Sequence, residues 1–149
     1  MTRKNYSVKI KAVSESDHTF LFELLKERDP ISNISHKKMP TYPKHVKFIR
    51  SHPYAKWYVV LVNGNKCGSA YLSKLNEIGL HMKKEYCKEE INDEVVKILM
   101  KKNPRQRFLV NVNPRDTRKK NFFTERGFRL IQHTYELIPK RTKYEKKKD

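Results

Sequence analysis

Cysteine is scarce in this sequence, which has only Cys67 and Cys87 among its 149 residues. The two form no CxxC pair and fit no spacing typical of a zinc ligand set. Two isolated cysteines also do not make the disulfide framework of a small secreted domain. Zinc fingers and disulfide-stapled mini-proteins are therefore excluded, and we expect a reducing, cytoplasmic compartment. Neither thiol has a neighbouring base, so neither is expected to act as a nucleophile.

Long hydrophobic runs are also missing. No stretch approaches the roughly 20 apolar residues that a membrane-spanning helix needs. The basic start, MTRKNYSVKIK, is not followed by the apolar core of a secretory signal. We therefore predict no membrane association. Hydrophobic residues make up only 37% of the chain, but they cluster in periodic segments, which is typical of a folded domain rather than a disordered chain.

Acidic residues are outnumbered, with 16 Asp and Glu against 34 Lys and Arg, so the formal net charge is +18. Such a charge favours an anionic partner, which can be nucleic acid, a phosphorylated cofactor, an anionic lipid surface or an acidic protein. A general lysine bias without a specific role is the competing interpretation. No nucleic-acid-binding motif is visible. The length fits one domain, which we place at residues 1–138, followed by a basic, disordered tail at 139–149.

Hydrophobic periodicity predicts strands and helices in mixed order. An Asn63-Gly64 pair between two apolar runs predicts a hairpin. Helices are bounded by N-cap residues such as Ser14 and Asp116, by Asp29-Pro30 and by Gly127. The predicted strands are 7–13, 57–62, 68–72, 77–82, 108–112 and 130–137, and the predicted helices begin near 14, 43, 91 and 116. The order predicts an α/β (α+β) domain in which helices cover a mixed sheet.

Three stretches resemble the GNAT superfamily of acyl-CoA N-acyltransferases. They are WYVVLVNGNKCGSAY at 57–71, EIGLHM at 77–82, and NPRDTRKKNFFTERGF at 113–128. The resemblance implies a GNAT-like, mostly antiparallel central sheet with helices on both faces. It also implies an N-acetyltransferase that moves an acyl group from acetyl-CoA, or another acyl-CoA, directly to a primary amine of a small molecule or amino sugar. The family needs no metal, and the protein is expected to be a monomer or a homodimer.

The resemblance also implies a cofactor site. The backbone of Leu80 and Met82 corresponds to the strand that holds the pantetheine arm, and the start of the next helix corresponds to the pyrophosphate loop. Both loop glycines of the family are replaced, by Glu90 and Asn92, and the family's tyrosine acid is replaced by Phe123. We therefore expect a degenerate loop. The remaining implied cofactor residues are Lys84, Lys88, Glu89, Ile91, Asp93, Asn113, Asp116 and Phe122.

By position in the same resemblance, Glu77 is the candidate general base, and His36, Tyr42 and Tyr71 are the candidate acceptor-pocket residues. Each also has an ordinary interpretation. Glu77 can be a strand-edge carboxylate paired with a basic side chain, and the tyrosines can belong to the core. His81 lies on the same strand face as Glu77 and is interpreted as a half-buried polar residue. The alternative function is a catalytically inactive GNAT-like module whose basic surface binds nucleic acid or another anionic partner.

Overall fold

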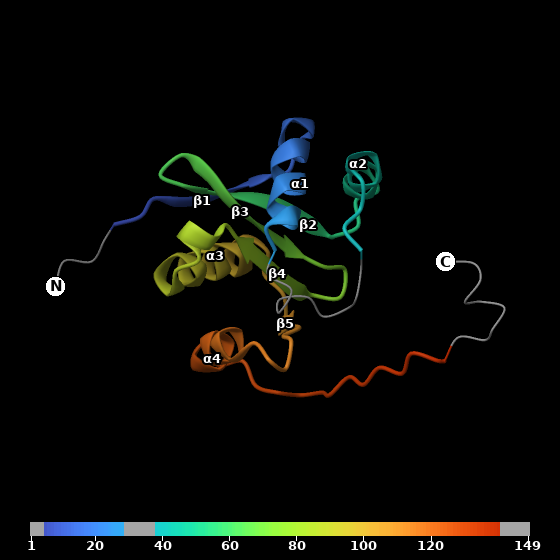
Figure 1. The fold of residues 1–149 in the computed structure, drawn as a ribbon. Helices are drawn as coiled ribbons and strands as arrows, with labels where there is room; N and C mark the ends of the chain where they lie inside the picture. Colours follow the sequence, from blue (N-terminus) through green and yellow to red (C-terminus); the bar gives the residue numbers. More distant parts are fainter. Residues whose placement is uncertain (1–4, 29–37, 141–149) are drawn as a thin grey trace.

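A single mixed sheet organises the chain. The computed structural model describes residues 5–28 and 38–140. Its strands lie in sequence order across the sheet: β1 (Val8–Ala12), β2 (Lys56–Val62), β3 (Asn65–Leu72), β4 (Glu77–Met82) and β5 (Leu109–Val110). The first four pair antiparallel, whereas β5 runs parallel to β4 (Figure 1). The predicted α/β class and the mostly antiparallel sheet are confirmed.

The hairpin between β2 and β3 forms at Asn63-Gly64. Both residues have positive φ angles, 50° and 83°, as a tight type I′ hairpin turn requires. A bulge follows Val60, where the register shifts before Leu61. The local turn chemistry therefore sets the start of the pairing that continues through β3 and β4.

Four helices complete the described fold: α1 (His18–Lys26), α2 (Tyr42–Arg50), α3 (Glu89–Lys102) and α4 (Thr117–Glu125). Two short 3-10 turns, η1 (Glu15–Asp17) and η3 (Lys84–Tyr86), precede α1 and α3. Pro43 stands in the first turn of α2, where its missing N–H costs nothing. The Asp116 carboxylate accepts the Lys119 N–H at the start of α4, and Gly127 follows its end at φ 93°.

The helices cover both faces of the sheet (Figure 1). On one face, Leu21 of α1 and Ile49 of α2 pack with Val59. On the other face, Val95 and Leu99 of α3 belong to the two larger core clusters, and α4 adds its buried phenylalanine to one of them. No helix among the described residues is long and apolar enough to cross a membrane.

A buried carboxylate fixes the corner between β1 and α1. The Asp17 side chain is fully buried, and its two oxygens lie 2.7 Å from the Lys11 and Lys66 ammonium groups. It also accepts the Ser14 N–H at 2.9 Å. Burial alone raises the pKa of Asp17, but these hydrogen bonds outweigh it and hold the pKa well below its ordinary value. The pair of lysines therefore keeps this carboxylate ionised inside the fold.

Two of the predicted strands differ from the structure. The strand expected at 108–112 is reduced to the two residues of β5. The strand expected at 130–137 was a wrong prediction, because these residues are extended, exposed and outside the sheet. Their apolar–polar alternation is typical of a strand, but a strand needs a neighbour to supply its backbone hydrogen bonds. Within the described chain no such neighbour lies beside them. Of the tail predicted at 139–149, residues 141–149 lie outside the described residues.

Candidate functional site

The parting of β4 from β5 defines the candidate site. The two parallel strands pair only at Glu77 with Leu109 and Ile78 with Val110. On the β3 side, Ser73 N donates to Glu77 O and Lys83 N donates to Cys67 O, both at 2.8 Å. The direction of the backbone groups alternates along an antiparallel strand. Leu80 and Met82 therefore direct their N–H and C=O groups toward the edge that β5 leaves.

Aromatic side chains line the neighbouring sheet face, on the side of α1 and α2. Tyr71 lies over Gly79, so closely that a Cβ at position 79 would stand 2.0 Å from its ring. The Tyr54 ring stacks on Tyr71 with a centroid distance of 3.8 Å and an angle of 7°. Beside them, Trp57 Nε1 donates to Ser69 Oγ at 2.7 Å. Gly79 thus lets a flat aromatic platform form against β4.

Positive charge surrounds the far end of this platform. His81 follows Gly79 on the same face, opposite Ser69 of β3. Burial, together with the positive charges of Arg28 and Lys119, lowers the pKa of His81 to about 4, so the imidazole is neutral at pH 7. Burial, and then the charge of Arg28, also lowers the pKa of Lys119. The end of α1 and the first turn of α4 therefore bring two cations to the region where β4 is open.

Glu77 sits at the other end of β4, where β5 is still paired. Its carboxylate accepts the Ser73 hydroxyl at 3.0 Å and the Asn111 side-chain amide. These two hydrogen bonds orient both carboxylate oxygens of Glu77 at the place where β4 and β5 are paired. His81 lies four positions after Glu77 on the strand, a distance of roughly 13 Å. The Glu77 carboxylate and the His81 imidazole therefore lie at different positions along β4.

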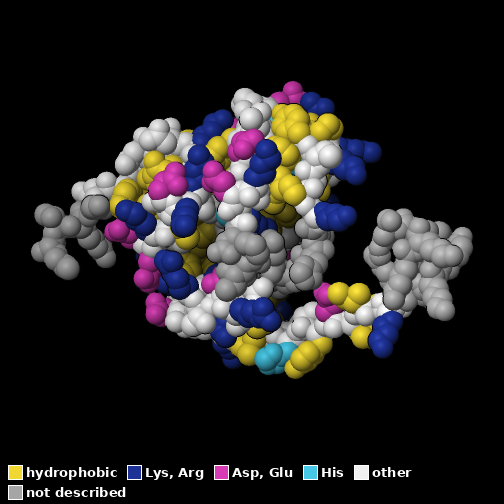
Figure 2. Space-filling model, in the orientation of Figure 1, with side chains coloured by type: hydrophobic (Ala, Val, Ile, Leu, Met, Phe, Trp, Pro, Cys, Tyr) yellow, Lys and Arg dark blue, Asp and Glu magenta, His cyan; other side chains and the backbone are white. Residues whose placement is uncertain are grey.

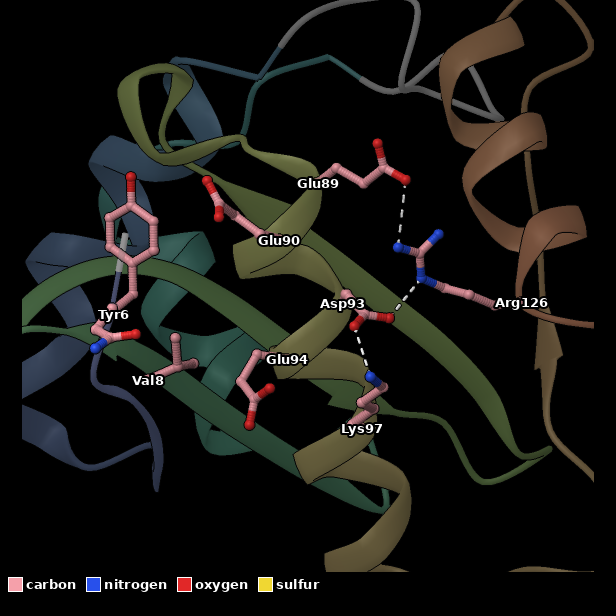
Figure 3. Close-up of a pocket in the computed structure, with 9 residues that line it drawn as sticks. Tyr6, Val8, Glu89, Glu90, Asp93, Glu94, Lys97 and Arg126 are labelled. Atoms are coloured by element: carbon pink, nitrogen blue, oxygen red, sulfur yellow. Dashed lines mark hydrogen bonds and ion pairs between the residues drawn. The ribbon is translucent and has the colours of Figure 1, made fainter. Parts of the chain in front are cut away.

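The beginning of α3 carries carboxylates where a phosphate would need donors. A hollow of about 610 Å³ lies beside it, and its lining includes Glu89, Glu90, Asp93 and Glu94 (Figure 3). Arg126 reaches across from α4, with its Nε 2.7 Å from Asp93 and its Nη2 3.4 Å from Glu89. The first N–H groups of a helix are free and favour anions. At the start of α3, the carboxylates oppose this preference for anions, and the guanidinium of Arg126 partly restores it.

Several predicted cofactor residues have structural partners. Lys88 points to Tyr6, with Nζ 3.4 Å from the phenol oxygen, and Asn92 Nδ2 contacts Cys87 Sγ at 3.9 Å. The Phe122 ring lies 3.7 Å below the Arg126 guanidinium. The remaining ones divide between core, turn and cap positions: Ile91 is buried, Lys84 belongs to η3, Asn113 Oδ1 accepts the Arg115 N–H at 2.9 Å, and Asp116 caps α4.

The predicted acceptor residues are only partly brought together. Tyr71 lies on the platform, whereas Tyr42 stands at the start of α2, edge-on to Phe22 at 5.3 Å. His36 lies outside the described residues. Sequence reasoning missed the two cations, Arg28 and Lys119, and it gave His81 only an ordinary role. No local motif marks them, because the chain brings them together only through α1, β4 and α4.

No protein-family model matches this sequence, and no curated protein does. Solved structures do match. A spermidine N-acetyltransferase from Vibrio cholerae, determined with CoA and spermine, superposes with a TM-score of 0.71 at 14% identity and covers 85% of this chain and 83% of its own. A domain from Methanocaldococcus jannaschii gives a TM-score of 0.68 at 17% identity, covering 89% and 94% of the two chains.

A dodecameric form of the Vibrio cholerae enzyme superposes with a TM-score of 0.67 at 14% identity and covers 88% of this chain and 84% of its own. Sequence identities this low show a similarity of fold only. Among the described residues, no group of three or more His, Cys, Asp or Glu side chains is arranged to hold a metal ion. The sheet, the parted β4 and β5 strands and these superpositions together show that the chain has the fold of the GNAT acetyltransferases.

Proposed function

We propose that the protein is an acyl-CoA-dependent N-acyltransferase, most simply an N-acetyltransferase, that acts on a primary amine of a small molecule. One observation carries the proposal: β5 leaves β4 after two residue pairs, so the backbone groups of Leu80 and Met82 face an open edge. An extended amide-containing chain such as pantetheine can bind such an edge as a strand would. The neighbour of similar fold from Vibrio cholerae was determined with CoA, which supports an acyl-CoA as the co-substrate.

The chemistry requires a deprotonated amine beside the thioester. The amine nitrogen attacks the carbonyl carbon, a C–N bond forms, the C–S bond breaks, and the electron pair leaves with sulfur as thiolate. The amine proton passes to a base, for which Glu77 is the candidate because Ser73 and Asn111 orient its carboxylate. Backbone N–H groups on the open edge of β4 stabilise the developing oxyanion. The cations Arg28 and Lys119 favour the departing thiolate.

These two cations also bear on the acceptor. A polyamine, the ligand of the Vibrio cholerae neighbour, would be repelled by Arg28 and Lys119 near His81. An amine that carries a carboxylate or phosphate would be attracted. We therefore place the acceptor among small amines or amino sugars with an anionic group, and we expect an amino sugar phosphate to be acetylated faster than spermidine.

The test is calorimetric titration with acetyl-CoA at low and at moderate salt, followed by turnover assays. Saturable binding that persists at moderate salt supports the proposal. The variant Glu90→Gly/Asn92→Gly restores the family's loop glycines and should bind tighter, because it removes a carboxylate and lets the backbone approach phosphate. Glu77→Gln should slow turnover and leave binding unchanged. Turnover identical to the parent across the pH range would eliminate Glu77 as the base.

The alternative, an inactive module that binds nucleic acid, is favoured by one observation. The start of α3 presents Glu89 and Glu90, whereas α4 and the turn before it present the exposed cations Arg115, Arg118 and Lys120. Absence of acetyl-CoA binding in both the parent and the glycine variant, together with binding of an oligonucleotide, would support this function. A steep loss of that affinity with salt would indicate contacts with phosphate only.

A further inference from the structure

The last described segment, residues 129–140, leaves the domain as an extended arm. In Figure 1 it runs from the end of α4 past the sheet and away from the body. Its hydrogen bonding and ring contacts are internal: Gln132 Nε2 donates to Thr134 Oγ1 at 3.2 Å, and the His133 and Tyr135 rings stack. No backbone hydrogen bond in the described chain joins the arm to another element. We call this segment the C-terminal arm.

The C-terminal arm exposes large hydrophobic side chains. Five large hydrophobic residues are exposed, with exposed fractions of 58 to 90%: Leu130, Ile131, Tyr135, Leu137 and Ile138. In the space-filling view, yellow hydrophobic side chains lie along the segment that extends from the body (Figure 2). In an extended chain, Ile131, Tyr135 and Leu137 share one face with His133, whereas Gln132, Thr134 and Glu136 share the other, with Leu130 and Ile138 at its two ends. This is the pattern of a strand with one buried face.

Among the described strands, the sheet has an unpaired edge at β5. As the last strand in the order, β5 has no strand on its outer side within the described chain. Beside it, Phe108, Val110 and Val112 are only half buried against the core cluster that includes Ile78. An edge of unpaired backbone groups with an apolar neighbourhood is a template for an added strand.

We propose that the C-terminal arm of one chain adds to the sheet of a second copy beside β5, and that the two copies exchange arms in a two-fold dimer. Each chain carries both the C-terminal arm and the unpaired edge of β5. When two copies exchange arms, each arm pairs with the β5 edge of the other copy, and the two contacts are identical, as an isologous interface requires. Residues 130–138 span roughly 30 Å when extended, longer than the average strand of five or six residues. The arm is therefore long enough to bridge two domains.

The test compares two full-length variants that add equal charge to opposite faces of the arm. Ile131→Glu/Leu137→Glu places carboxylates on the apolar face, whereas Gln132→Glu/Thr134→Glu places them on the polar face. Light scattering after size exclusion should give twice the 17.9 kDa chain mass for the parent and the polar-face variant. It should give the single-chain mass for the apolar-face variant. Circular dichroism checks that all three remain folded.

A second measurement identifies the receiving edge. A fluorescent peptide of residues 128–140 should bind saturably to the full-length Ile131→Glu/Leu137→Glu variant, whose β5 edge is vacant, and much more weakly to the parent dimer. A monomeric parent would overturn the proposal, because the arm would then be free or folded onto its own sheet. A parent dimer whose mass is the same in both variants would overturn it too, because the arm would not hold the copies together.

Discussion

The half-buried imidazole of His81 leads to a quantitative prediction about how stability depends on pH. Its pKa is lowered from 6.5 to about 4 in the folded protein, first by burial and then by the charges of Arg28 and Lys119. Between these two pH values the unfolded chain binds a proton that the folded chain does not, so the stability contributed by neutral His81 is lost as the pH falls from 6.5 toward 4. At pH 4.5, this linkage amounts to about 2–3 kcal/mol.

The perturbation is His81→Gln, which keeps a polar side chain but does not titrate. Urea denaturation followed by circular dichroism at pH 7.5 and pH 4.5 should show that the parent loses about 2–3 kcal/mol more unfolding free energy than the variant. His45, whose pKa is also lowered by burial and by His18, is present in both proteins, so its effect cancels in the comparison. An equal loss in parent and variant would refute the reasoning.

Nuclear magnetic resonance separates the two causes of the shift. The imidazole resonances of His81 should titrate near pH 4 in the parent. In Lys119→Met the midpoint should move upward, because one of the two nearby positive charges is gone while the burial remains. A midpoint near 6.5 in the folded parent would show that the His81 imidazole is solvated and would contradict the shift.

Three further changes test other parts of the fold. Leu99→Ala in α3, at a fully buried position, should lower the unfolding free energy by about 2–5 kcal/mol in urea denaturation, because it leaves a cavity. Asp17→Asn should cost about 3 kcal/mol at neutral pH, because it leaves Lys11 and Lys66 without their carboxylate. That difference should shrink as the pH falls below the ordinary Asp value of 3.8, because the unfolded parent chain then binds a proton at Asp17 that the folded carboxylate does not. Gly79→Ala should displace the Tyr71 ring and reduce the near-ultraviolet dichroism; a spectrum like that of the parent would contradict the stacked platform.

Local patterns in the sequence predicted most of the elements correctly. The Asn63-Gly64 turn, the alternation of 77–82 and the helix cap at Asp116 each depend on residues close together in the chain. They are confirmed at the predicted positions. The order of these elements, with the stretches that resemble the GNAT superfamily, was enough to predict the fold. The assignment of Glu77 as base and of the cofactor residues remains a prediction.

Tertiary structure decided what depends on distant partners. The alternation at 130–137 could not show whether a neighbouring strand exists, because backbone pairing needs a second strand that local sequence does not supply. The neutral state of His81 depends in the same way on Arg28 and Lys119, which come from α1 and α4. Propensity and turn chemistry act over a few residues and can be read along the chain. Burial, electrostatic fields and strand partners arise only when separate segments meet, and they set the chemistry along β4.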